Sequence, residues 1–170
     1  MTNLYDHQKK IINNITKDLR KLNATGLIFP QIPVGTGKSL IVINIIKKYP
    51  GKTMLISLNK TLKSQFIEQG KANGLDFDQV EVYTAGEFLR NKDVLNKEKK
   101  YDLLILDIPK ILGSKLSEKI SKIKFKSIIK VEGSRPSGDE KIFLESLIDK
   151  KKKSTINKKR ITVDKLTKVF

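Results

Sequence analysis

The chain contains no cysteine, and its single histidine is His7. Without cysteine neither a disulfide framework nor a thiolate metal site can form, and one histidine cannot assemble a histidine-based metal site. Long apolar runs are also missing: none approaches the ~20 residues that span a bilayer, and the N-terminus MTNLYDHQKK is polar. We therefore expect an intracellular protein of the cytoplasm, or of the nucleus if the host is a eukaryote, with no membrane partner.

Acidic side chains are scarce: 18 Asp and Glu stand against 35 Lys and Arg, which gives a formal net charge of +17. Arginine is scarce too, since only four of the basic residues are arginine: Arg20, Arg90, Arg135 and Arg160. A basic domain of this kind usually binds a polyanion, most often nucleic acid. The alternative is coding bias, because an AT-rich genome enriches Lys, Ile and Asn in any protein.

A chain of 170 residues is long enough for one domain with a proper core and too short for two of ordinary size. We expect residues 1–150 to form that domain. The remaining segment, 151–170, is rich in lysine. Lysine runs occur both in solvated tails and in docking or nucleic-acid-binding segments, so both interpretations of 151–170 stay open.

Apolar strands alternate with amphipathic helices along the chain. This order predicts an α/β fold with a mostly parallel sheet and helices on both faces. The predicted strands are 26–29, 52–58, 79–85, 101–107 and 126–133. The predicted helices are 6–23, 39–49, 59–74, 86–90, 114–124 and 139–150, and the segment 91–100 is expected to be charged surface chain. Ligands of such sheets bind at the carboxyl ends of the strands.

The stretch IPVGTGKS, residues 32–39, lies between the first predicted strand and the helix that follows. Gly35 and Gly37 let the backbone wrap closely around phosphate oxygens, and the helix N-terminus adds unpaired N–H groups. Lys38 would reach the β- and γ-phosphates of ATP, and the Ser39 hydroxyl would ligate magnesium. The alternative is a Gly-rich turn without a ligand, but the flanking strand and helix favour a phosphate loop.

Ile32 stands where the general phosphate-loop pattern has its first glycine. Superfamily-2 helicases and translocases commonly have an apolar or small residue at that position, and IPVGTGKS resembles their phosphate loop. Other segments resemble the motifs of that family in its order, from Leu4 to about Asp139. LYDHQKKII resembles the glutamine motif, LISLNKTLKSQF motif Ia, YTAGEF motif Ib, LLILDIPK the Asp-Glu-x-His box and VEGSRPSGD motif III. The resemblance implies the first RecA-like P-loop NTPase domain of such a motor.

Residue roles follow from the resemblance. Gln8 would bind the adenine edge, and Asp107 would hold magnesium together with Ser39. The residues expected to bind ATP are Gln8, Gly35, Thr36, Gly37, Lys38, Ser39 and Asp107. Motifs Ia and Ib imply contacts to a nucleic-acid backbone from Asn59, Lys60, Lys63, Thr84 and Gly86. Such contacts carry no base code, so DNA and RNA are not distinguished.

The sequence departs from the family at its catalytic box. Ile108 occupies the position of the glutamate that polarises the attacking water, and isoleucine cannot accept a proton. The loss of a general base typically lowers a rate by ~10²–10⁴-fold. Glu132, in the motif III segment, is the one candidate for a substitute base. Lys110 also puts a positive charge where the family has a histidine or an acid.

Two hypotheses remain. In the first, the chain is a helicase-derived module that binds ATP and nucleic acid, does not hydrolyse ATP alone and serves as a regulatory or structural subunit of a protein partner. In the second, it is the first motor domain of a DNA or RNA helicase or translocase. The second RecA-like domain, which supplies the arginine finger in this family, would then lie on another chain or be missing. Ile108 favours the first hypothesis, and the intact Lys38, Ser39 and Asp107 favour the second.

Overall fold

The protein is seen in a computed structural model, which describes residues 3–21, 26–30, 32, 37–49, 51–96, 98, 100–111, 113–131 and 138–149. The strands are β1 (Gly26–Ile28), β2 (Thr53–Ser57), β3 (Val80–Thr84), β4 (Leu103–Asp107) and β5 (Ser127–Lys130). The helices are α1 (Asp6–Lys21), α2 (Lys38–Lys48), α3 (Lys60–Ala72), α4 (Ala85–Arg90), the 3-10 turn η1 (Asp93–Leu95), α5 (Lys115–Ile120) and α6 (Gly138–Ser146).

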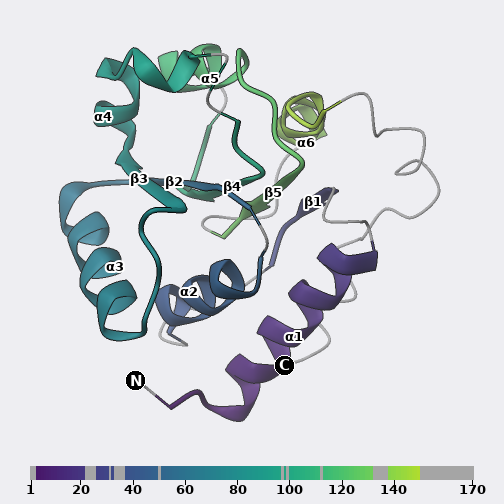
Figure 1. The fold of residues 1–170 in the computed structure, drawn as a ribbon. Helices are drawn as coiled ribbons and strands as arrows, with labels where there is room; N and C mark the ends of the chain where they lie inside the picture. The colour runs from purple at the N-terminus through teal and green to yellow at the C-terminus, as the bar shows by residue number, and fades with distance from the viewer. Residues whose placement is uncertain are drawn as a thin grey trace.

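The five strands form one sheet in the order β1-β5-β4-β2-β3, and every pairing is parallel. This confirms the predicted α/β fold. Two apolar clusters cover the sheet, one packed with α1, α2 and α3 and the other with α4, α5 and α6 (Figure 1). Because side chains alternate along a strand, Leu103 and Ile105 enter the first cluster, and Leu104 and Leu106 enter the second.

Two predicted helices extend beyond the observed C-terminal ends, and one segment expected to be surface chain is partly buried. Helix α5 ends at Ile120, because the chain turns there and buries Phe125 in the second cluster. Helix α6 ends at Ser146, since the backbone of residues 147–149 hydrogen bonds to Phe125 instead of continuing the helix. The segment 91–100 is not simply surface chain, because η1 inserts Val94, 1% exposed, beside Phe88. None of the described helices has the length and apolar character needed to cross a bilayer.

A buried ion pair connects the end of β5 to α6. The side chains of Lys130 and Glu140 are 2% and 8% exposed, and Lys130 Nζ lies 2.6 Å from Glu140 Oε1. The same ammonium donates a hydrogen bond to the carbonyl oxygen of Pro109 at 3.0 Å. Pro109 follows β4 by two residues. This ion pair therefore holds α6 and the turn after Asp107 against the same strand end.

A second polar cluster ties the edge strand β3 to its neighbours. Tyr83 and Tyr101 each donate a hydrogen bond to Glu81 Oε2 at 2.6 Å, and Lys52 Nζ lies 3.0 Å from Glu81 Oε1. Lys52 precedes β2 and Tyr101 precedes β4. Partial burial by itself raises the pKa of the Glu81 carboxyl, but the hydrogen bonds from Tyr101, Tyr83 and Lys52 together outweigh it and lower the pKa to about 2.

We predict that Glu140→Gln destabilises the fold by about 3–5 kcal/mol, because it leaves the Lys130 ammonium buried without its counter-charge. The double variant Lys130→Met/Glu140→Leu removes both charges and should unfold close to wild type. Urea unfolding of the three proteins gives the comparison. Equal stability of wild type and Glu140→Gln would show that the pair is not needed.

We also predict a pH-dependent loss of stability for Glu81→Gln. The folded-state pKa of Glu81 lies near 2, below its ordinary value of 4.5, so the carboxylate contributes stability above that ordinary value, and the contribution is lost as pH falls toward 2. Wild type should exceed the variant by about 1–2 kcal/mol at neutral pH, since the carboxylate stays partly solvated. The difference should vanish near pH 2.

Thermal unfolding across that pH range measures the effect. Glu118→Gln, on the exposed surface of α5, removes a carboxylate without this cluster and is the matched control. A stability difference between wild type and Glu81→Gln that does not change with pH would contradict the assignment.

Candidate nucleotide and nucleic-acid site

Three helices begin at the carboxyl edge of the sheet. Helix α2 begins at Lys38, α3 follows β2 and begins at Lys60, and α4 follows β3 directly and begins at Ala85. Asp107, the last residue of β4, lies at the same edge. The parallel topology thus gathers residues from distant parts of the chain at one edge, where ligands of α/β sheets bind (Figure 1).

The centre of this edge is an ion pair. Lys38 Nζ lies 2.7 Å from Asp107 Oδ1, and the two side chains are 27% and 17% exposed. Lys38 is the first residue of α2, and Ser39, the second, is half-buried. An ammonium at the start of a helix is suited to a phosphate, and a carboxylate beside it is suited to a cation.

Gln8 of α1 lies against the end of the glycine loop. Its side chain is 3% exposed, and its Oε1 accepts a hydrogen bond from the backbone N–H of Tyr5 at 2.9 Å. Gly37 has φ 78°, and a Cβ there would come 2.4 Å from Gln8 Nε2. The positive φ therefore favours glycine at residue 37, and a larger residue there would also displace the side-chain amide of Gln8. The structure places Gln8, Gly37, Lys38 and Asp107 in one region.

Several predicted residues lie outside the described ranges. They are Gly35 and Thr36 of the phosphate loop and Glu132, the candidate base. The segment 151–170, expected to be a basic tail or linker, also lies outside them. Their predicted roles stay predictions.

Ile108 lies on the other side of the sheet from the ion pair. It is 2% exposed and belongs to the buried cluster of α4, α5 and α6, together with Phe29 and Leu144. Asp107 has the alternate orientation, toward α2 and Lys38. The residue in the position of the family's glutamate is therefore part of the hydrophobic core.

The described residues fit a magnesium ion held jointly with a nucleotide. No group of three or more His, Asp or Glu side chains gathers among them. Magnesium is usually bound by one or two carboxylates together with substrate phosphates and water, so a full cage of protein ligands is not required. Asp107 and Ser39 offer the carboxylate and the hydroxyl used for this ion in P-loop proteins.

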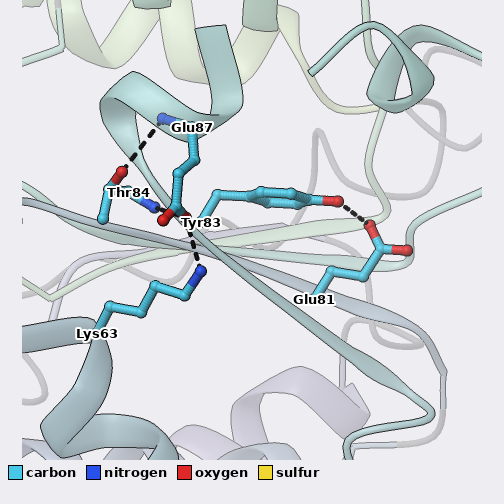
Figure 2. Close-up of polar contacts among 5 residues, drawn as sticks. All are labelled: Lys63, Glu81, Tyr83, Thr84 and Glu87. Atoms are coloured by element: carbon cyan, nitrogen blue, oxygen red, sulfur yellow. Dashed lines mark hydrogen bonds and ion pairs between the residues drawn. The ribbon is translucent and has the colours of Figure 1, made fainter. Parts of the chain in front are cut away.

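Helices α3 and α4 are joined by a second ion pair at the same edge. Lys63 Nζ lies 2.6 Å from Glu87 Oε2. Thr84 and Glu87 form a capping box, in which Thr84 Oγ1 accepts from Glu87 N–H at 3.1 Å and Glu87 Oε2 accepts from Thr84 N–H at 3.1 Å (Figure 2). The hydrogen bond from Lys63, followed by that from the Thr84 backbone, lowers the pKa of Glu87.

The other predicted nucleic-acid contacts lie around this pair. Asn59 is the N-cap of α3, and its Oδ1 accepts from Leu62 N–H at 3.0 Å. Lys60 is exposed, and Gly86 lies in the first turn of α4, where an added Cβ would come 3.3 Å from the Arg90 guanidinium. These residues lie at the starts of two neighbouring helices, and their contacts to nucleic acid stay predictions.

Sequence reasoning missed the acidic partners at this edge. The stretch TAGE, residues 84–87, matches the Ser/Thr-x-x-Glu pattern of a capping box, so the roles of Thr84 and Glu87 could have been found. The pairing of Glu87 with Lys63 carries no such pattern, because the two residues belong to different helices. The same holds for Lys130 and Glu140.

Comparison with known proteins identifies the chain. The family described as "Type III restriction enzyme, res subunit" matches residues 1–156. Among curated proteins no relative matches. Among solved structures, the Sulfolobus solfataricus SWI2/SNF2 ATPase core in complex with dsDNA superposes with a TM-score of 0.64 at 13% sequence identity. The match covers 99% of this chain and 43% of that one. The chain belongs to the type III restriction enzyme res subunit family and has the RecA-like fold of a superfamily-2 helicase motor domain.

Proposed function

We propose that this chain is a helicase-derived module that binds ATP with magnesium and a nucleic-acid backbone, does not hydrolyse ATP by itself and serves a partner protein as a regulatory or structural subunit. The observation that carries the proposal is the end of β4. Asp107 is directed to Lys38, whereas its neighbour Ile108 is 2% exposed in the core. The site keeps groups that hold a nucleotide and has an apolar side chain where a base is needed.

The position of Ile108 indicates that the substitution Ile108→Glu alone would not restore the general base. A glutamate there would enter a cluster that contains Phe29 and Leu144. Burying a carboxylate among apolar side chains is costly, so the backbone would have to change before such a residue reached the nucleotide. The packing of this strand end therefore favours nucleotide binding over hydrolysis.

Each nucleotide contact has a distinct chemical role in this proposal. Lys38 leaves Asp107 and neutralises the β- and γ-phosphate oxygens, while the first N–H groups of α2 donate to them. Asp107 and Ser39 would hold a magnesium ion, which would supply neutralisation of phosphate charge. Gln8 binds the adenine edge from its position beside Gly37. The glycine loop around Gly35 and Thr36 supplies further backbone N–H groups.

Two observations support binding of nucleic acid: the positive net charge and the structural similarity to a protein solved with DNA. The net charge is +17, and the similar Sulfolobus structure is a complex with dsDNA. In our proposal Asn59, Lys60, Lys63, Thr84 and Gly86 approach phosphates at the starts of α3 and α4. Such contacts give affinity that depends on salt and little on sequence.

The second candidate function is that of one half of a motor. It is favoured by the retained pair of Lys38 and Asp107, and by the share of 43% that this chain matches in the SWI2/SNF2 core. In that case a second RecA-like domain would close over the nucleotide and supply the arginine finger. Glu132 would then be the candidate base.

We predict that wild type binds ATP with magnesium in calorimetry and that Lys38→Ala weakens binding at least about tenfold, because the phosphate loses its charge partner. Lys48→Ala, at the other end of α2, is the matched control and should bind like wild type. Phosphate release by wild type should equal that of Lys38→Ala, with or without nucleic acid, because the base that supplies ~10²–10⁴-fold is absent.

Two results would contradict this proposal. Absence of binding heat at millimolar ATP would remove the nucleotide function. Robust hydrolysis by wild type that nucleic acid stimulates and Lys38→Ala abolishes would overturn the deficiency and favour the motor candidate.

We predict that Glu87→Gln strengthens nucleic-acid binding. Glutamine still completes a capping box, but the variant frees the Lys63 ammonium from its carboxylate, so one more phosphate can be neutralised. The slope of log affinity against log salt should become steeper by up to ~0.7–0.9. Adding Lys63→Gln to that variant should return the slope to about its wild-type value, because the freed ammonium is then absent.

Fluorescence anisotropy with labelled single-stranded and duplex oligonucleotides measures both quantities. Glu68→Gln and Lys71→Gln make the same charge changes at exposed positions later in α3. If these controls match the Glu87 and Lys63 variants, the net charge alone governs binding and the assigned contacts are wrong.

A further inference from the structure

The hydroxyl of Ser57 is buried at the carboxyl edge of the sheet. Ser57 is the last residue of β2 and is 1% exposed. Within the described part of the chain its Oγ has no hydrogen-bond partner. A buried hydroxyl without a partner costs free energy, and in native proteins such groups are few and need an explanation.

The position of Ser57 suggests its partner. In the parallel register Ser57 pairs with Asp107 of β4 on one side and with Thr84 of β3 on the other. Adjacent strands lie about 4.8 Å apart, and residues in register point to the same face. The Ser57 hydroxyl therefore lies next to the Asp107 carboxylate, on the face of α2 and Lys38.

In the present structure Lys38 satisfies Asp107 with its ammonium at 2.7 Å. Thr84 has its hydroxyl oxygen engaged by the N–H of Glu87 in the capping box. Asp107, Ser57 and Thr84 are paired in register on three adjacent strands. Among the residues that the structure describes, only the Ser57 side chain of these three has neither an ion pair nor a hydrogen bond.

We propose that Ser57 is a positioning residue for Asp107 in the nucleotide-bound state. When Lys38 turns to the phosphates, the Ser57 hydroxyl rotates and donates a hydrogen bond to one carboxylate oxygen of Asp107. The other oxygen is then held toward the magnesium ion. Groups that orient a metal-binding carboxylate in this way contribute strongly to metal affinity. This inference rests on the proposed binding of ATP with magnesium.

Thr53 offers a matched control within the same strand. It is 0% exposed, its Oγ1 also has no hydrogen-bond partner among the described residues, and it lies on the same face as Ser57. It sits at the amino end of β2, away from Asp107. Ser57→Ala and Thr53→Val each remove a hydroxyl and little else.

The test measures ATP affinity by calorimetry with magnesium and with EDTA, and the melting temperature without ligand. For Ser57→Ala we expect the gain in ATP affinity from magnesium to fall about tenfold. Its affinity in EDTA should stay unchanged, and its unliganded melting temperature should equal or exceed that of wild type, because an unsatisfied hydroxyl is gone. Thr53→Val should keep the full magnesium gain.

An unchanged magnesium gain in Ser57→Ala would overturn the inference while leaving ATP binding by wild type intact. An equal loss in Thr53→Val would overturn it as well, since both hydroxyls would then act through the fold. Wild type that binds no ATP under either condition would instead overturn the proposed function, and this inference with it.

Discussion

Consecutive side chains of a β-strand point to opposite faces, and this alternation governs the end of β4. Asp107 faces α2 and pairs with Lys38, so Ile108 must face the cluster of α4, α5 and α6. The turn that follows is held by Lys130 through the carbonyl of Pro109. Because the backbone is fixed from both faces, the two residues cannot exchange roles without repacking the core.

Three ion pairs lie at the carboxyl edge of the sheet: Lys38 with Asp107, Lys63 with Glu87 and Lys130 with Glu140. Each joins residues from different elements, and the last is almost fully buried. The pairs differ in their exposure to solvent. Lys38 and Lys63 are about one-quarter exposed, whereas Lys130 is 2% exposed. The first two pairs are therefore accessible from solution, and the third is structural.

The likeness to the SWI2/SNF2 core at 13% identity shows how little of this fold depends on particular side chains. Alternating apolar strands and helices specify a covered parallel sheet in both chains. The two hypotheses about catalysis differ in how they interpret Ile108 and Lys110, which depart from the catalytic box of the family. The family match over residues 1–156 leaves that question to the site itself.

The sequence by itself determined the α/β class and the order of the elements, because hydrophobic periodicity is a local property. It also predicted a phosphate loop from its glycine spacing. It also determined that Ile108 cannot act as a base. Only the tertiary structure decided that Val94 and Ile108 are core residues, that Lys63 and Lys130 have acidic partners, and that Ser57 lies beside Asp107. Strand order and register create these contacts, and neither can be deduced from the spacing of residues along one chain.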